Sequence, residues 1–192
     1  PVILDIGCGP GIFLSEAKRL DFNPWGIELS HRAAEYAEKH FHLSHVIQGT
    51  PNHFSKQFPD MRFDAITAFD VVEHAENPEH IFSFVHKSLK PQGLFIMTLP
   101  MIDSFTARML GKKWHALVPS HLNYFTKTSL KNFYTSAGFD LAYERSYTRS
   151  LSLSYLFERL LKLQHGRLSF LSGIVIPINL FDEVEIGIRP RT

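Results

Sequence analysis

Sulfur chemistry and long apolar runs are both scarce in this chain of 192 residues. Cys8 is the single cysteine, which excludes a disulfide framework and a zinc cluster made of thiolates. No apolar run reaches the roughly 18 residues that a membrane-spanning helix needs, and no secretory leader precedes the first apolar segment. Residues 168–181 come nearest, but Ser, Gly, Pro and Asn interrupt them, which is typical of a buried or interfacial segment. These absences predict a soluble, cytoplasmic protein without stable membrane insertion.

Charge of one sign is also scarce. The 20 Lys and Arg residues nearly balance the 19 Asp and Glu residues, leaving a formal net charge of +1. So small an excess disfavours a nucleic-acid partner, although the 11 histidines leave room for a local basic face. The hydrophobic content of 44% is enough for a substantial core, and there is no internal repeat or low-complexity tract. A single domain over residues 1–192 is the expected organisation.

The most informative segment is VILDIGCGPGIFL, from Val2 to Leu14. Its apolar start predicts a short strand buried on both faces of a parallel sheet. Asp5 interrupts that strand, which predicts a strand end open to a polar ligand or to the backbone amides of the next turn. Glycines then follow at alternate positions, and they permit the positive φ and close backbone approach that a ligand-binding turn needs.

Strand and helix patterns alternate over the first hundred residues, as in a parallel α/β sheet. Apolar strands are predicted at residues 2–6, 25–29, 45–48, 63–69 and 93–99. Helices are predicted from Phe13, Ala17 and Leu20, from Ser30 as N-cap to His40, and after Asn77-Pro78 until Pro91 and Gly93 end the pattern.

The second half of the chain is less regular. Residues 101–125 contain Trp114, His115 and Tyr124 among basic side chains and form a candidate lid. A helix over 127–137 with Gly138 as its stop, a strand over 140–147, a helical stretch over 151–163 and a strand over 179–189 are predicted after it. The last of these implies an antiparallel hairpin at the C-terminal end.

Three motifs in order carry a resemblance to a known family. The turn has the form D-x-G-x-G-x-G, and Ile12 stands where a dinucleotide fingerprint needs its third glycine. FDAITAFDVVEHAENP (63–78) and LKPQGLFIMTLP (89–100) follow. Together they resemble the class I S-adenosylmethionine-dependent methyltransferases, in particular small-molecule enzymes of the ubiquinone-biosynthesis O-methyltransferase type. The resemblance implies a Rossmann-like, seven-stranded, mostly parallel sheet with helices on both faces and a C-terminal antiparallel hairpin; the helices that commonly precede the first strand are not in this sequence.

The resemblance also implies S-adenosylmethionine as cofactor and a set of contacts to it. Glu28 ends the second strand, where a doubly wound sheet places a carboxylate beside a ribose, so position and resemblance agree on it. Thr50 stands where the family usually has an acidic residue that meets the adenine amino group. The implied contacts are Asp5, Gly7, Cys8, Gly9, Gly11, Glu28, Leu29, Thr50 and Asp70.

Candidate catalytic residues lie after the fourth strand and in the lid. His74 and His121 are candidate bases for deprotonating an acceptor hydroxyl, with Glu73 beside His74. In some relatives the acidic and histidine residues of this stretch bind a divalent metal, and Asp70, Glu73 and His74 are the matching residues; our prediction is a site without metal. The alternative is that Glu73 and His74 only order the loop.

The sequence therefore predicts methyl transfer to a small-molecule acceptor, such as a hydroxyl of a phenolic, sugar or cell-envelope metabolite. A catalytically silent domain that binds the nucleoside cofactor as a regulatory or partner subunit is the main alternative. An NAD-dependent oxidoreductase is disfavoured by the missing third glycine. The sequence leaves open whether the protein forms a homodimer.

Overall fold

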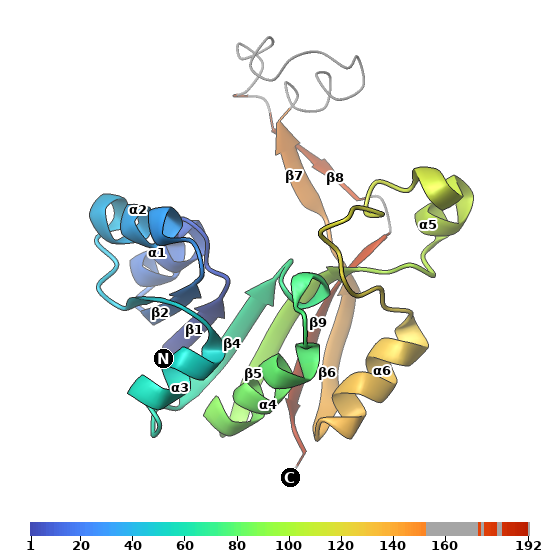
Figure 1. The fold of residues 1–192 in the computed structure, drawn as a ribbon. Coiled ribbons are helices and arrows are strands. Elements are labelled where there is room, and N and C mark those ends of the chain that lie inside the picture. The colour runs from blue at the N-terminus through green and yellow to red at the C-terminus, as the bar shows by residue number, and fades with distance from the viewer. Residues whose placement is uncertain (153–172, 174, 180–181, 192) are drawn as a thin grey trace.

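A computed structural model describes residues 1–152, 173, 175–179 and 182–191 of the chain. A seven-stranded sheet in the order β3-β2-β1-β4-β5-β9-β6 runs through it (Figure 1). The strands are β1 (Val2–Ile6), β2 (Asn23–Glu28), β3 (Val46–Gln48), β4 (Phe63–Phe69), β5 (Leu89–Pro100), β6 (Phe139–Ser146) and β9 (Glu183–Pro190). The first five are parallel, and β9 pairs antiparallel with both β5 and β6. The predicted mostly parallel sheet with an antiparallel C-terminal pair is confirmed.

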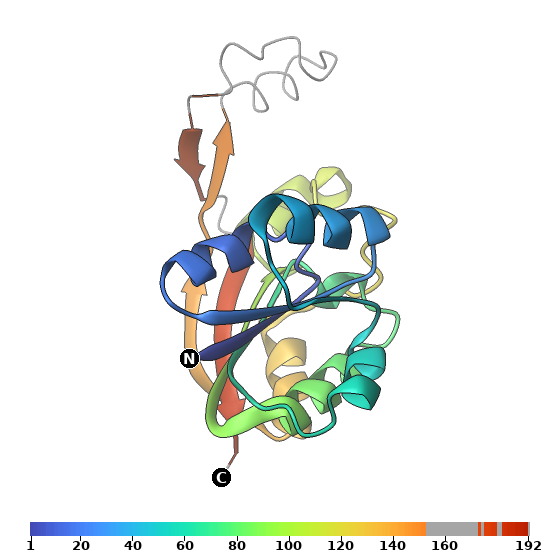
Figure 2. The ribbon, with the colours of Figure 1, turned by 90° about the vertical axis from the view of Figure 1, so that its left-hand side faces the viewer.

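Helices cover both faces of the sheet. They are α1 (Ile12–Arg19), α2 (His31–Phe41), α3 (Pro51–Gln57), α4 (Pro78–Ser88) and α6 (Lys127–Ser136). Figures 1 and 2 show α3, α4 and α6 together on one face, with α1 on the other. This arrangement leaves the edge at the carboxyl ends of β1, β2 and β4 for a ligand, as is usual in open α/β sheets.

Side-chain caps fix where the helices begin. Ser30, Asn77 and Thr126 each accept a hydrogen bond from the backbone N–H three residues on, at 3.3, 3.3 and 3.0 Å. Such caps satisfy amides that the helix itself leaves unpaired, which stabilises the start by about 1 kcal/mol. The predicted starts after Ser30 and Asn77 are therefore confirmed.

Aromatic packing joins the second half of the sheet to the helices above it. Phe82 on α4 is fully buried, with its ring 5.5 Å from that of Phe95 on β5 and 6.0 Å from that of Phe139 on β6. Edge-to-face contacts of this kind add to the burial of large apolar area. The packing holds α4, and with it the loop before α4, at a fixed place over the sheet.

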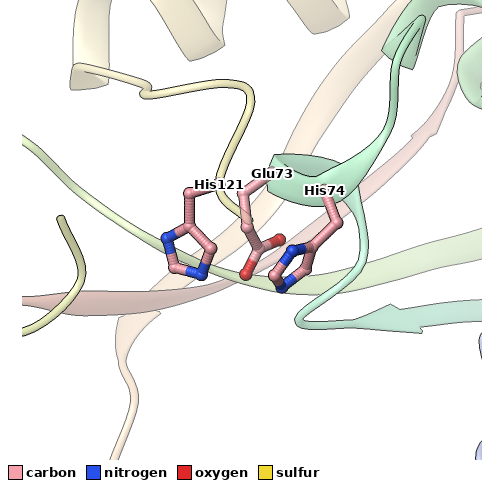
Figure 3. Close-up of side chains that lie close together, drawn as sticks. All are labelled: Glu73, His74 and His121. Atoms are coloured by element: carbon pink, nitrogen blue, oxygen red, sulfur yellow. The ribbon is translucent and has the colours of Figure 1, made fainter. Parts of the chain in front are cut away.

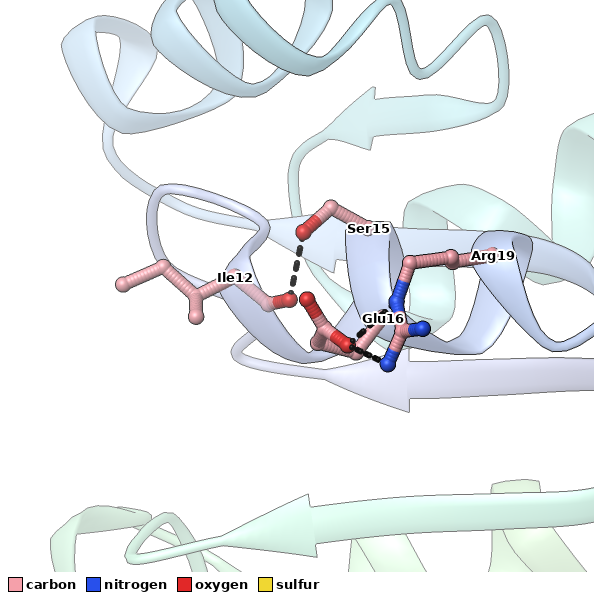
Figure 4. A network of polar contacts seen from close by, with 4 residues as sticks. All are labelled: Ile12, Ser15, Glu16 and Arg19. Carbon is pink, nitrogen blue, oxygen red and sulfur yellow. Dashed lines mark hydrogen bonds and ion pairs between the residues drawn. The ribbon is translucent and has the colours of Figure 1, made fainter.

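The buried face of α1 differs from the predicted one. Phe13 and Leu20 are 38% and 61% exposed, whereas Leu14 and Ala17 are buried. Leu14 takes the inward position that was expected of Phe13, whereas Ala17 is buried as predicted. On its outer surface, Arg19 donates to Glu16 and the Ser15 hydroxyl donates to the carbonyl of Ile12 (Figure 4).

Two further predictions of secondary structure were wrong or incomplete. β5 begins at Leu89 and not at Gly93, because Leu89 pairs with Phe63 and the register then jumps to the pair Ala65–Leu94. Pro91 therefore lies in an irregular part of the strand, where its missing N–H costs no ladder bond. Helix α3 was missed, although Thr50-Pro51 is a typical N-cap followed by proline at the first helical position.

The candidate lid has more structure than its sequence indicated. Residues 101–125 contain helix α5 (Phe105–Leu110) and the 3-10 turn η2 (Gly111–Lys113). Ala107, Trp114 and Ala116 are buried together beneath them. The indole N–H of Trp114 donates to Asp182 at 2.9 Å, which ties the segment to the start of β9.

A two-stranded arm, β7 (Arg149–Ser152) with β8 (Val175–Ile178), extends beyond the main sheet (Figures 1 and 2). Leu151 and Ser152 are in β7, so the predicted helix over 151–163 is wrong at its start, and its remainder lies outside the described residues. Most of the apolar stretch 168–181 also lies outside them. Among the described residues, no helix has the length and apolar character needed to cross a membrane.

Candidate cofactor and catalytic site

The glycine turn adopts the conformation that its sequence predicted. Gly7, Gly9 and Gly11 have φ values of 72°, 53° and 81°, in the left-handed region. A Cβ on Gly7 would lie 2.6 Å from Cγ2 of Val71, so the turn also needs a glycine there for space. Because glycine has no side chain, the backbone of the turn between β1 and α1 is not covered by side chains of these residues on the side that faces the end of β4.

Glu28 closes the next strand and is bonded to the turn. One carboxylate oxygen accepts from the backbone N–H of Gly9 at 2.8 Å, and the other accepts from that of Ser30 at 2.7 Å. Each oxygen has a second lone pair that is directed elsewhere. The sequence predicted Glu28 as a ligand residue, and the structure adds that it also holds the turn and the start of α2 in place.

A cavity of about 800 Å³ opens beside these groups. This volume is within the range of cofactor sites. Its walls come from the ends of β1 and β2, from α3 with the residues before it, and from the segment between β4 and α4. The lining residues include Gly7, Glu28, Leu29, Gly49, Thr50, Asn52, Ser55, Val71, His74, Asn77, His80 and Phe84.

Leu29 and Thr50 lie at the cavity, as their positions in the sequence predicted. Leu29 is 71% exposed, so its side chain is open to a ligand in the cavity. The Thr50 hydroxyl oxygen already accepts from the N–H of His53 at 3.2 Å. Thr50 is therefore the N-cap of α3 as well as part of the cavity wall.

Asp5 was predicted to face a polar ligand or the backbone amides of the next turn, and the contact that the structure gives its side chain is with β4. Its side chain is buried under the turn, and one oxygen accepts from the hydroxyl of Thr67 at 2.6 Å. Burial raises its pKa from 3.8 to about 7, the Thr67 bond lowers it in part, and the charge of Glu28 raises it further. Asp5 therefore joins β1 to β4 through a buried side-chain hydrogen bond.

The side chain of Cys8 packs into the core, so the predicted contact of Cys8 with the cofactor would be made by its backbone. Its side chain is buried with Leu14, Ala37 and Leu43 on the far side of the turn. Burial raises the pKa of its thiol to about 12, so the thiolate is not accessible near neutral pH. Of Cys8, only the backbone is available to a ligand in the cavity.

Gly9 and Gly11 complete the turn in different ways. Gly9 donates its N–H to Glu28, and a Cβ there would meet no atom within 4 Å, so its requirement is conformational. Gly11 packs against α2, since a Cβ there would lie 2.8 Å from that of Ala37. Neither residue carries a side chain toward the cavity, which leaves the backbone as the binding group.

Asp70 stands at the end of β4 with a φ of 55°. Its carboxylate accepts from the hydroxyl of Thr98 at 3.0 Å, and its own N–H donates to the Thr98 carbonyl at 3.2 Å. A left-handed conformation costs a non-glycine residue roughly 1–2 kcal/mol. The two contacts to β5 hold that conformation and direct the chain into the 3-10 turn η1 (Val72–His74).

The three predicted catalytic residues lie together (Figure 3). One ligand atom from each of Glu73, His74 and His121 lies within 4.8 Å of the others. Glu73 is 1% exposed, and the rings of His74 and His121 meet edge to face with centroids 4.6 Å apart. His121, which follows His74 by 47 positions in the sequence, thus joins the adjacent pair Glu73 and His74 in one cluster. Figure 3 shows all three side chains pointing to a common space.

Backbone contacts hold this cluster together. The carbonyl of Glu73 accepts from the N–H groups of Leu122 and Asn123, at 2.8 and 3.0 Å. The Asn123 amide donates to the carbonyl of Ala75 at 2.6 Å. His74 Nδ1 lies 2.8 Å from the Ser120 carbonyl; because a carbonyl only accepts, Nδ1 carries a proton and Nε2 has the lone pair in the neutral ring.

Sequence reasoning found the catalytic candidates but missed their supports. Ser120 acts through its carbonyl, and Asn123 acts through both its backbone N–H and its side-chain amide. Nothing in a single sequence indicates which carbonyl an amide will reach. Asn52 and Ser55 line the cavity from α3 and were missed because that helix was missed. Their spacing of three residues places both on one helix face, so recognition of the Thr50-Pro51 start would have found them.

Comparison with known proteins agrees with this geometry. The family model described as a methyltransferase domain matches residues 1–144. The mitochondrial ubiquinone biosynthesis O-methyltransferase of Saccharomyces cerevisiae is 29% identical over 133 residues, covering 65% of this chain and 43% of that protein. Sterol 24-C-methyltransferase erg6 of Aspergillus fumigatus is 35% identical over 99 residues, covering 48% of this chain and 26% of that protein.

A solved structure shows the same fold. An S-adenosylmethionine-dependent methyltransferase from Archaeoglobus fulgidus superposes with a TM-score of 0.67 at 19% identity, covering 98% of this chain and 85% of that one. In contrast, the chain spans less than half the length of the two curated relatives above, at 43% and 26%.

Proposed function

This chain belongs to the methyltransferase domain family, with the class I fold whose members use S-adenosylmethionine, and from that premise we propose that it methylates a small molecule. The acceptor group that we propose is a hydroxyl of a phenolic, sugar or cell-envelope metabolite. The observation that carries the proposal is the bare glycine turn beside Glu28 at the mouth of the 800 Å³ cavity. The Saccharomyces relative is named as an O-methyltransferase, which supports oxygen as the methylated atom.

The chain's residues suit the parts of this cofactor. The free lone pairs of Glu28 accept from the two hydroxyls of a ribose, and Leu29 offers an apolar surface to a base beside it. The bound sulfonium would supply an activated methyl group, which transfers by direct displacement. The protein's task is then to align acceptor and methyl carbon and to exclude water.

In this proposal His74 is the general base. Its Nε2 has the lone pair, because Nδ1 donates to Ser120, so Nε2 takes the proton as the acceptor oxygen becomes nucleophilic. The buried carboxylate of Glu73 favours the imidazolium that results, and His121 lies against the same ring. The segment 101–125, which supplies His121, acts as the lid over the acceptor within one domain of residues 1–192.

The donor set also fits a divalent cation, which is the second candidate role for the cluster. One carboxylate and two imidazoles are ligands that Zn²⁺, Mn²⁺ and Fe²⁺ accept. The Ser120 carbonyl accepts from Nδ1 of His74 and so orients the ring with Nε2 available to a metal. Here His121 replaces Asp70 in the set that the sequence indicated, because the residues whose ligand atoms lie close together are Glu73, His74 and His121.

Metal titration distinguishes the two roles. If the cluster binds metal, calorimetry with Mn²⁺ and Zn²⁺ should show one site, and His121→Ala should weaken it at least tenfold, as loss of one ligand does. His80→Ala is the matched control, since His80 lines the same cavity away from the cluster. Equal affinity in the wild type and His121→Ala would contradict metal binding and leave proton transfer as the role of the cluster.

The proposed function is tested first by binding and then by label transfer. Calorimetry with S-adenosylmethionine, its demethylated product and NAD should give micromolar affinity for the first two alone. The protein is then incubated with methyl-labelled cofactor and a small-molecule extract from which macromolecules have been filtered. The proposed activity is supported if label appears in the small-molecule fraction and the His74→Ala variant transfers about 100-fold less of it, or still less. Tight binding without any transferred label would favour the silent domain, and preference for NAD would overturn the proposal.

A further inference from the structure

Positive charge is concentrated in one part of this nearly neutral chain. No Asp or Glu occurs between Asp103 and Asp140, whereas that stretch contains five Lys and Arg residues. Arg108, Lys112 and Lys113 are exposed and lie within six residues of one another, on α5 and η2. The protein therefore has a local cationic surface that its net charge of +1 conceals.

Large apolar side chains are exposed among these cations. Phe105, Met109 and Leu110 are 73%, 65% and 39% exposed. Phe105 and Met109 are four residues apart on α5, so they share one face of the helix. We call the set of apolar and cationic residues the α5–η2 surface, which consists of Phe105, Arg108, Met109, Leu110, Lys112 and Lys113.

The α5–η2 surface rests on a fixed base. Ser104 caps α5 by accepting from the N–H of Ala107 at 3.1 Å, and Ala107 faces inward with Trp114. Trp114 is bonded to the buried Asp182. Because the inward residues are well packed, the outward ones are exposed by the fold itself and not by a local lack of structure.

The position of the surface relates it to the candidate site. Figures 1 and 2 both show α5 at the end of the molecule where the parallel strands have their carboxyl ends, the end that the β7–β8 arm also extends from. The same lid segment continues to His121 and to Leu122, whose N–H donates to the Glu73 carbonyl. A partner that binds α5 is thus connected to the catalytic cluster through one short, hydrogen-bonded piece of chain.

We propose that the α5–η2 surface binds the anionic surface of a lipid bilayer. Aromatic and aliphatic side chains flanked by Lys and Arg suit the boundary between acyl chains and charged headgroups, where the apolar groups insert and the cations remain at the phosphates. A second copy of this chain is a poor occupant, because it would bring two cationic surfaces together. RNA is a poor one because Met109 and Leu110 offer it neither stacking nor hydrogen bonds, and Phe105 is the single aromatic ring in the surface for a base to stack on.

Binding to a bilayer would narrow the class of acceptor, and this consequence rests on the proposed function. A bilayer against α5 places the lid at the membrane surface, so the acceptor would be a membrane-resident amphiphile with its reactive group at headgroup level. The binding itself does not depend on methyl transfer. If the protein does not bind vesicles, the proposed cofactor site is not affected. If it does not bind S-adenosylmethionine, the vesicle experiment still tests the membrane proposal independently.

Vesicle co-sedimentation of the whole chain tests the proposal. Vesicles of phosphatidylcholine with about one third phosphatidylglycerol should bind the protein, and vesicles of phosphatidylcholine alone should bind it at least tenfold more weakly. Since each cation near an anionic surface contributes about a fivefold gain, the double variant Lys112→Gln/Lys113→Gln should bind about 25-fold more weakly. Phe105→Ser/Met109→Ser should lose binding to a similar or greater extent.

The control variant is Leu20→Ser/Lys56→Gln, which removes one exposed apolar and one exposed cationic side chain from other parts of the surface. It should bind like the wild type, and all variants should keep the wild-type affinity for S-adenosylmethionine. Equal binding to neutral and anionic vesicles, or equal losses in the control, would overturn the proposal. The proposal would also be overturned if the protein bound RNA but not vesicles and the Lys112→Gln/Lys113→Gln variant lost that RNA binding.

Discussion

Replacement of Glu28 by glutamine should weaken the binding of S-adenosylmethionine at least 100-fold. The wild-type carboxylate accepts from the amides of Gly9 and Ser30 and, in the proposed complex, from two ribose hydroxyls. Glutamine has one acceptor oxygen, and its NH₂ group would face a backbone N–H that also donates. Each lost hydrogen bond to a charged group costs about 1.5–3 kcal/mol, so the loss of two corresponds to a factor of 100 or more. Calorimetric titration measures it.

Glu16→Gln is the matched control for this variant. Glu16 lies on α1, with its side chain 57% exposed and paired with Arg19 at 2.8 Å (Figure 4). An exposed pair of this kind contributes little, so the affinity for S-adenosylmethionine should change less than twofold. If Glu28→Gln binds within threefold of the wild type while its far-UV spectrum is unchanged, Glu28 does not hold the ribose and the assignment fails.

The second large effect concerns stability and pH. Asp5→Asn should raise the free energy of unfolding at pH 8 by roughly 4 kcal/mol and change it little near pH 4. The reason is that burial holds the pKa of Asp5 at about 7 in the folded protein, against 3.8 for the exposed group. A pKa difference of this size between the folded and unfolded states corresponds to roughly 4 kcal/mol of folding stability that is lost when Asp5 ionises. The asparagine oxygen keeps the bond from the Thr67 hydroxyl.

The sign follows from which state binds the proton more tightly. With the folded pKa of Asp5 raised, its contribution to stability is fully present below pH 3.8 and is lost as the pH rises through about 7. Urea unfolding from pH 4 to pH 8 should therefore show a decline in the wild type that is smaller in Asp5→Asn.

Asp64→Asn, on the neighbouring strand, supplies a control of opposite sign. The pKa of Asp64 is lowered by hydrogen bonds from Lys90 and from the N–H of Val2, so its contribution is present at neutral pH and lost in acid. This variant should be less stable than the wild type at pH 7, with a difference that shrinks as the pH falls. A wild-type decline that persists unchanged in Asp5→Asn would show that another group causes it.

Local sequence was sufficient for the elements whose own residues specify them. The apolar runs of β1 and β4, the glycines of the first turn and the caps Ser30 and Asn77 all act within a few residues, and each was predicted correctly. The start of β5 was misplaced because a register shift depends on the partner strand and not on the strand itself.

The sequence by itself determined the sheet, the glycine turn and the carboxylate at the end of β2, because chain periodicity and backbone freedom are local properties. Tertiary structure alone decided what those groups do. It buried Asp5 beneath the turn, made Glu28 a support of that turn, and joined His121 to Glu73 and His74 through backbone bonds from residues 120–123. It also left the apolar side chains of α5 exposed among cations. Burial, charge and proximity depend on residues distant in the sequence, and only the folded chain brings those together.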